Sequence, residues 1–262
     1  MARKRQHSRI TTILLDIEGV LTIEKRAIPG AVRTLETLHG LGYHIACVTN
    51  ATTRSQEELF CHLQNLGFDL KCDQIFTPIS IVKKMISHRT VALYTHPHIK
   101  AEFSEFEQEY HHPEVVLLGD GVLGGYTPEL LQSIFQQIMR GATLIALHKN
   151  RYWQKSTGLH IDLGAYVAAL EYATGSKAYI AGKPSPEAFL TAIAREPKQS
   201  ITSTLFVGDD IEIDIGGAQA LGMRTILVQT GKFRKKLIKA SSVQPDLIIP
   251  SITDLIPALL LL

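Results

Sequence analysis

Short apolar runs alternate with segments of helical periodicity along most of the chain. The first run, 13–15, is followed by a helical pattern over 32–41, and the next run, 43–48, by a second helical pattern over 59–66. Apolar residues three and four positions apart are typical of a helix with one buried face, and unbroken apolar runs are typical of buried parallel strands. Strands and helices that alternate through short links predict a parallel α/β sheet with right-handed connections.

The same alternation starts afresh near residue 90. There we expect strands and helices over 91–94, 115–118, 128–140, 144–147 and 165–173. A segment of about 85 residues is long enough for a small domain of its own. We therefore predict an α/β domain at 89–175, inserted into a core that consists of residues 1–88 and 176–262. The expected core strands continue at 178–182, 204–207, 224–229 and 246–249.

Carboxylates and other polar side chains stand where the expected core strands end. They are Asp16 and Glu18, Thr49 and Asn50, Lys183, and Asp209 and Asp210, with Asp214 on the helix that follows. The carboxyl ends of parallel strands meet at one edge of a doubly wound sheet, which is where ligands bind in open α/β folds. We therefore expect these side chains to share one cleft.

Several carboxylates in one cleft repel one another, and a divalent cation relieves that repulsion. A small carboxylate set that leaves room for water and phosphate favours Mg²⁺. Lys183 and the Thr49 hydroxyl would then hold the oxygens of a phosphoryl group. Alone, each segment has a structural interpretation: a strand-end turn for Thr49-Asn50, a surface position for Lys183, and a helix N-cap for Asp209-Asp210. Their occurrence together, in this order, favours a phosphoryl-transfer site.

Composition narrows the class of protein. Of the 262 residues 45% are hydrophobic and 20% are charged, which is typical of a globular protein. The net charge of +2 does not indicate a nucleic-acid or membrane partner. We expect the basic residues 3–5 to form a solvated tail, because no apolar segment of signal length follows them. Cys47, Cys61 and Cys72 lack metal-ligand spacing and indicate reduced thiols in a cytoplasmic protein.

Four segments resemble the four motifs of the haloacid dehalogenase-like hydrolase superfamily. They are DIEGVL at 16–21, TNATT at 49–53, GKPSPEAF at 182–189 and GDDIEIDIGGAQALGM at 208–223. The inserted domain is similar to the α/β cap of subclass IIA, and the segments at 148–175 and 229–234 also resemble members of that subclass. The resemblance implies a Rossmann-like core with a cap of the C2 type and a Mg²⁺-dependent phosphatase that acts on a small phosphorylated compound.

By position, the resemblance assigns the reacting residues. Asp16 would be the nucleophile that forms an aspartyl-phosphate. Mg²⁺ would be held by the Asp16 carboxylate, the backbone carbonyl of Glu18 and Asp209. Asp214 would orient these groups through water or lysine, and Asp210 would hydrogen-bond loop backbone.

The resemblance also implies which groups hold the phosphate. Thr49 and the Asn50 backbone N–H would bind phosphoryl oxygens. Lys183 would neutralise both the nucleophile and the charge that develops on the phosphoryl group.

Glu18 departs from the superfamily pattern, in which an aspartate at this position acts as general acid and then as general base. A glutamate also occurs here in the enolase-phosphatase branch. Glutamate keeps a titratable carboxyl group with one more methylene, so acid–base chemistry is retained if the loop repositions it. We expect Glu18 to protonate the leaving group and then to activate the hydrolytic water.

The cap is expected to exclude water and to select the substrate. Its candidate contact residues are Lys149, Arg151, His160 and Asp162. The basic members would meet a second phosphate, and Asp162 would meet a cationic substrate. Tyr152 and Trp153 either join this contact loop or instead belong to the cap core or to a dimer contact. Subclass IIA proteins often pair through their caps, which implies a homodimer.

Three functional hypotheses remain at this point. The first is hydrolysis of a small phosphate monoester. The second, by resemblance, is hydrolysis of P–O–P or P–N bonds in inorganic pyrophosphate, phospholysine or phosphohistidine. The third is a phospho-ligand binding protein with weak catalysis, which metal-dependent phosphate release would distinguish from the enzymes.

Overall fold

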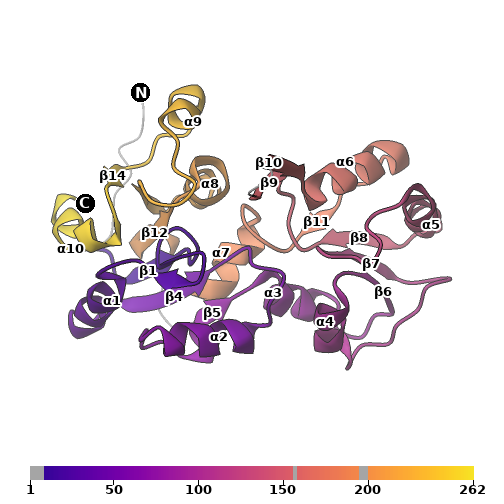
Figure 1. The fold of residues 1–262 in the computed structure, drawn as a ribbon, viewed down its shortest axis with the longest axis horizontal. Coiled ribbons are helices and arrows are strands. Elements are labelled where there is room, and N and C mark those ends of the chain that lie inside the picture. The colour runs from indigo at the N-terminus through magenta and orange to yellow at the C-terminus, as the bar shows by residue number, and fades with distance from the viewer. Residues whose placement is uncertain (1–8, 156–157, 195–199) are drawn as a thin grey trace. The chain divides into compact units, whose positions relative to one another are not determined.

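Two compact units make up the chain in a computed structural model that describes residues 9–155, 158–194 and 200–262 (Figure 1). The first unit consists of the chain up to Thr49, Glu57–Phe76 and Lys183–Leu262. The second unit consists of Asn50–Gln56 and Thr77–Gly182. The chain therefore passes between the units four times.

Six parallel strands form the sheet of the first unit, in the order β14-β13-β12-β1-β4-β5. Their bounds are β1 Thr12–Leu15, β4 His44–Val48, β5 Ile75–Phe76, β12 Thr204–Gly208, β13 Arg224–Val228 and β14 Leu247–Ile249. In the register of the central strands, Leu15 lies opposite Val207 on one side and Cys47 on the other. The residues that follow β1 and β12 therefore emerge side by side.

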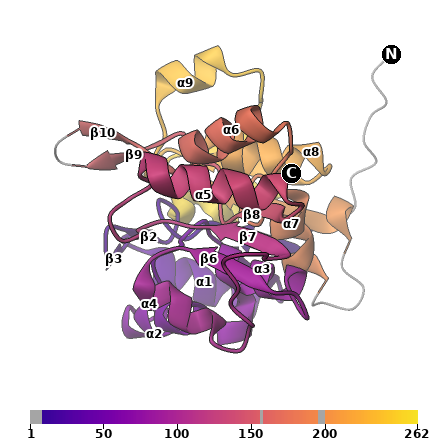
Figure 2. The same cartoon turned by 90° about the vertical axis from the view of Figure 1, so that its right-hand side faces the viewer.

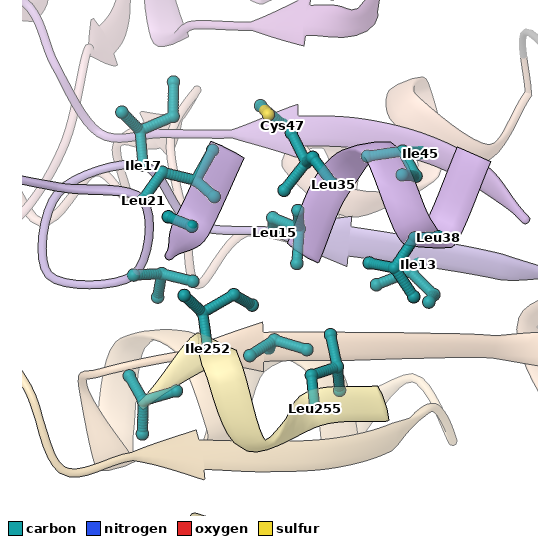
Figure 3. Close-up of a cluster of buried hydrophobic side chains, with 14 of the residues drawn as sticks. Ile13, Leu15, Ile17, Leu21, Leu35, Leu38, Ile45, Cys47, Ile252 and Leu255 are labelled. Carbon is teal, nitrogen blue, oxygen red and sulfur yellow. The ribbon is translucent and has the colours of Figure 1, made fainter. Parts of the chain in front are cut away.

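Helices cover both faces of this sheet, because side chains of successive strand residues point to opposite faces. The helices are α1 Ala31–Gly40, α2 Gln56–Asn65, α7 Pro186–Ile193, α8 Gly217–Ala220, α9 Lys235–Ala240 and α10 Leu255–Ala258. On one face, Ile13 and Leu15 pack with Leu35 of α1 and Leu255 of α10 (Figure 3). On the other face, the Phe189 ring of α7 meets the Phe206 ring edge-on, with 5.1 Å between their centroids.

The second unit has a parallel sheet of its own, in the order β11-β8-β7-β6. Its elements are α3 Pro78–Met85, β6 Val91–Tyr94, α4 Pro97–Lys100, β7 Val115–Leu118, α5 Pro128–Met139, β8 Thr143–Ala146, α6 Leu163–Thr174 and β11 Tyr179–Ile180. Figure 2 shows α5 and α6 along one face of the sheet, and their apolar residues share a core with those of β6, β7 and β8.

Two short hairpins lie outside the two parallel sheets. One lies in the first unit and consists of β2 (Thr22–Ile23) and β3 (Arg26–Ala27). The other, in the second unit, consists of β9 (Tyr152–Lys155) and β10 (Gly158–Ile161). The sequence pattern predicts neither, because a pair of very short strands has no periodicity long enough to read.

One expectation about the core sheet is wrong. The strand expected at 178–182 does not join the core: β11 pairs with β8, in the sheet of the second unit. The segment 178–182 is mostly apolar, as a core strand is, and only the pairing of β11 shows which sheet it joins. The second unit thus includes Asn50–Gln56 and then runs from Thr77 to Gly182, beyond the predicted limits of 89–175 at both ends. Among the described helices, none has the length and apolar character needed to cross a bilayer.

Candidate active site

Two neighbouring strands place the first two carboxylates. Asp16 follows β1 directly, and its N–H still donates to the Val207 carbonyl at 2.9 Å. Asp209 follows β12 directly. Both side chains are buried, at 6% and 2% exposure. The loop after Asp16 turns at Gly19, which has a φ of +93°, and a Cβ there would lie 2.0 Å from Asp209 Oδ2. A glycine is required because no side chain fits between the loop and the carboxylate.

Lys183 joins Asp16 to a third buried carboxylate. Its ammonium lies 2.7 Å from Asp16 Oδ1 and 2.7 Å from Asp214 Oδ1. The second oxygen of Asp214 accepts the backbone N–H groups of Asp209 and Asp210, at 3.1 and 3.2 Å. Asp214 therefore fixes both the lysine and the loop that carries Asp209.

Burial controls the charges of this cluster. It raises the pKa of Asp16 to about 6, although Lys183 opposes the shift. Burial also raises the pKa of Asp209 to about 8, and repulsion from Asp16 and Asp214 adds to the effect. For Lys183 burial alone would lower the pKa, but Asp16 and Asp214 outweigh it and hold the pKa above its ordinary value. The lysine is thus charged, and its single charge does not balance the three buried carboxylates of Asp16, Asp209 and Asp214.

The donor set fits a divalent metal ion. Asp16, Asp209 and Asp214 each offer a carboxylate oxygen, and these atoms lie within 4.8 Å of one another. Asp209 Oδ1 is buried without a hydrogen-bond partner. A buried, unpaired carboxylate oxygen is costly unless an ion binds it. Buried oxygen ligands of this kind suit a hard cation.

Glu18 stands apart from the buried carboxylates. It is exposed, and its carboxylate accepts the Glu24 N–H at 2.7 Å and the Thr22 hydroxyl at 3.2 Å. These contacts tie the side chain to the β2–β3 hairpin. Glu24, in the hairpin turn, has a φ of +50°.

The predicted phosphate-binding pair falls on the boundary of the units. Thr49 follows β4, is buried, and donates its N–H to the Phe76 carbonyl at 3.0 Å. Asn50 is the first residue of the second unit, where a Cβ on Gly182 would lie 2.6 Å from its Oδ1.

Sequence analysis singled out 229–234, the loop after β13, by resemblance alone and assigned it no role in the site. The Lys232 N–H donates to Asp209 Oδ2 at 2.7 Å, and the Thr230 hydroxyl donates to the Gly19 carbonyl. Gly231, between them, has a φ of +61°, and a Cβ there would also lie 2.0 Å from Asp209 Oδ2. The sequence could have indicated this loop, because a glycine and a lysine follow a predicted strand of the same sheet.

Asp210 has a local backbone role. Its Oδ1 accepts the N–H groups of Glu212 and Ile213, at 3.1 and 3.0 Å. It thereby caps the π-helical turn Ile211–Gly216 that carries Asp214.

The second unit contains a polar cluster that sequence reasoning found only in part. Asp120, His148 and Asp162 each offer a ligand atom within 4.8 Å of the others. They line a cavity of about 490 Å³ together with Thr52. Asp120 and His148 follow β7 and β8 closely. Their position just after predicted strands could have identified them as candidate site residues. Asp162 caps α6 by accepting the Leu163 N–H at 2.8 Å.

The hydrogen bonds of this cluster fix the histidine. His148 Nδ1 accepts the Asn150 N–H at 3.2 Å, so Nε2 carries the proton and donates to Asp120 Oδ2 at 2.8 Å. The Thr52 hydroxyl donates to the same oxygen. Burial opposes charge on Asp120, but these hydrogen bonds outweigh it and lower its pKa. His148 is therefore engaged at both nitrogens and holds Asp120 in place.

The remaining cap candidates differ in their contacts. Lys149 forms an ion pair with Glu171 of α6 at 2.5 Å. Arg151 and Tyr152 are exposed, and His160 is partly buried. The side chain of Trp153 lies outside the described residues.

Comparisons with known proteins agree with this geometry. A haloacid dehalogenase-like hydrolase model matches residues 13–109, and a HAD-hydrolase-like model matches residues 180–255. Haloacid dehalogenase-like hydrolase domain-containing protein 2 of Bos taurus is 36% identical over 235 residues, which are 86% of this chain and 86% of that protein. Phospholysine phosphohistidine inorganic pyrophosphate phosphatase of Rattus norvegicus is 37% identical over 238 residues, covering 87% and 86%.

A solved structure extends the match to the whole fold. The 4-nitrophenylphosphatase from Thermotoga maritima gives a TM-score of 0.84 at 25% identity, covering 95% of this chain and 97% of that one. The chain belongs to the haloacid dehalogenase-like hydrolase family, and it is a phosphate hydrolase. The predicted family and the Rossmann-like core with an inserted α/β cap are confirmed.

Two of the glycines with positive φ, Gly175 and Gly231, allow a test of the Asp209 contact. Gly175→Ala should cost about 1 kcal/mol of stability because the position is left-handed, and Gly231→Ala should cost more because its Cβ also collides with neighbouring atoms. At Gly175 a Cβ meets nothing within 4 Å, whereas at Gly231 it displaces Asp209. We expect only Gly231→Ala to lose most of the metal-dependent phosphate release. Full activity in Gly231→Ala would contradict the site.

Proposed function

We propose that the chain is a Mg²⁺-dependent phosphatase that hydrolyses a small phosphorylated compound through an aspartyl-phosphate on Asp16. The observation that carries this proposal is the buried cluster of Asp16, Asp209 and Asp214 around Lys183, in which Asp209 Oδ1 has no hydrogen-bond partner. Such a cluster is costly to fold and is explained by the chemistry it performs.

Three groups would hold the metal ion: the Asp16 carboxylate, the Asp209 carboxylate and the backbone carbonyl of Glu18. When bound, Mg²⁺ supplies positive charge to these carboxylates and to the oxygens of the phosphoryl group. Asp214 and Asp210 support the arrangement through the backbone of the 209–213 loop.

The chain's own residues carry the reaction. A carboxylate oxygen of Asp16 attacks the phosphorus in line, the bond from phosphorus to the leaving-group oxygen breaks, and the leaving group takes a proton from Glu18. Water then attacks the phosphorus of the aspartyl-phosphate and passes a proton to Glu18, which releases phosphate and restores Asp16. Lys183, Thr49 and the Asn50 N–H bind the phosphoryl oxygens and stabilise their charge.

To act as acid and base, the Glu18 carboxylate must leave its present hydrogen-bond partners. Its carboxylate is bound to the Glu24 N–H and the Thr22 hydroxyl. The contact with Glu24 is at the protein surface, and the buried Thr22 hydroxyl has a second acceptor in the Ile17 carbonyl at 3.4 Å, so releasing Glu18 costs little. We propose that substrate binding moves the carboxylate from the hairpin to the leaving group.

The substrate class follows from the relatives and the cap. Small phosphate monoesters come first, since a 4-nitrophenylphosphatase shares the fold. Pyrophosphate and P–N bonds form the second candidate class, because one relative is named for them.

Within the cap, Arg151, His160 and Asp162 are the proposed contacts for the leaving group. The ion pair of Lys149 with Glu171 supports a structural role for that lysine. The homodimer through the cap stays a prediction.

A phosphate-release screen tests the proposal. It would cover phosphate monoesters, pyrophosphate, phospholysine and phosphohistidine, each with and without Mg²⁺. We expect release to require Mg²⁺ and to fall by at least about 10³-fold in Asp16→Asn, since the nucleophile is lost. Asp69→Asn, at an exposed carboxylate, should leave the rate unchanged. Equal rates in wild type and Asp16→Asn would refute the mechanism.

Glu18→Gln tests the acid–base role. The glutamine Oε1 can still accept the Glu24 N–H and its amide NH2 can donate to the Thr22 hydroxyl oxygen, so the hairpin contact is kept while the titratable group is removed. We expect turnover to fall about 100-fold and the phosphorylated enzyme to accumulate. Glu24→Gln keeps the backbone N–H and serves as the control. Unchanged steady-state turnover in Glu18→Gln would exclude the role.

A further inference from the structure

The backbone of Lys232 is fastened to the catalytic loop. Its N–H is held by Asp209 Oδ2 at 2.7 Å, and the neighbouring Thr230 hydroxyl donates to the Gly19 carbonyl. Gly231 brings the two loops so close that a Cβ would lie 2.7 Å from the Cα of Gly19. These contacts position the start of a long cationic side chain beside the reacting carboxylates.

The two lysines of the site differ in their freedom to bind a substrate. Lys183 is 2% exposed and sits in two ion pairs of 2.7 Å, so its charge is committed to Asp16 and Asp214. The Lys232 side chain is 62% exposed, and its ammonium lies 3.8 Å from Asp210 Oδ2. An exposed ion pair at that distance is weak and is exchanged at little cost. Lys232 can therefore turn to the leaving group of an incoming substrate, whereas Lys183 is held beside Asp16 and serves only the transferred phosphoryl group.

The charge balance of the site indicates which leaving groups require the Lys232 ammonium. The carboxylates of Asp16, Asp209, Asp210 and Asp214 outnumber the two lysines by two charges, which one divalent cation would cancel. Lys183 and that cation already serve the transferred phosphoryl group. A leaving group without charge requires no further cation. A leaving group that carries a second phosphate adds negative charge next to the carboxylates and requires one.

We propose that Lys232 is a specificity-determining residue that binds the leaving group and favours leaving groups with a negative charge of their own. This inference rests on the phosphatase activity proposed above and deepens it. The substrate class that it favours is the phosphoanhydrides and other compounds with a second anionic group.

The test compares two inhibitors of the Mg²⁺-loaded enzyme. Pyrophosphate carries both the transferred and the second phosphate, and orthophosphate carries only one. Their inhibition constants are measured against hydrolysis of p-nitrophenyl phosphate at fixed free Mg²⁺. We expect Lys232→Met to reduce the preference for pyrophosphate over orthophosphate about tenfold, the loss typical of one charged hydrogen bond. Lys232→Arg should keep most of the preference, because the charge is retained.

A matched control separates this role from general electrostatics. Lys235→Met removes the same charge three residues further on, at the start of α9, and should leave the preference unchanged. An unchanged preference in Lys232→Met, with thermal melting showing a folded protein, would overturn the proposal. Equal losses in Lys232→Met and Lys235→Met would overturn it as well.

The inference and the proposed function fail in different ways. If wild type and Asp16→Asn released phosphate equally, the proposed function would be wrong. The role of Lys232 would then be decided by equilibrium binding of pyrophosphate and orthophosphate to the Mg²⁺-loaded wild type and Lys232→Met. A preference that does not depend on Lys232 would end the proposal there too.

Discussion

Burial of several carboxylates around one lysine is the constraint on which the site depends. Asp16, Asp209 and Asp214 are each at most 6% exposed, and Lys183 compensates only part of their charge. Desolvation of unpaired carboxylates is costly, as the raised pKa values of Asp16 and Asp209 record. The stability of the parallel sheet offsets this cost. Its strands β1 and β12 are buried on both faces and hold the two aspartates in fixed register. A divalent cation would relieve the repulsion between these carboxylates.

Glycine and backbone geometry explain how so many groups fit. Gly19 and Gly231 approach the Asp209 carboxylate from two loops, and either Cβ would collide with it. The Asp214 carboxylate takes two backbone N–H groups of the Asp209 loop and the Lys183 ammonium together. Asp209 and Lys183 are therefore positioned by neighbours that do not react themselves, as a preorganised site requires.

The sequence predicted most of the core and most of the site, for physical reasons. Long apolar runs and helical periodicity place β1, β4, β12 and α1 within one or two residues, and acids at strand ends identify Asp16 and Asp209. Pairing partners could not be predicted. β11 was expected in the core sheet but joins the second one, since its apolar residues suit either. Contacts between distant loops could not be predicted either, so no role was assigned to Asp120, His148 or Lys232.

The central claim is that Asp16 becomes covalently phosphorylated during turnover. The most direct measurement is a single-turnover reaction with Mg²⁺, stopped with acid after milliseconds and followed by peptide mass spectrometry. The account predicts phosphate on the peptide that contains Asp16, formed and lost at rates fast enough for turnover, and labile to hydroxylamine as an acyl phosphate must be. Phosphate release without any labelled peptide, or a label on another residue, would contradict it.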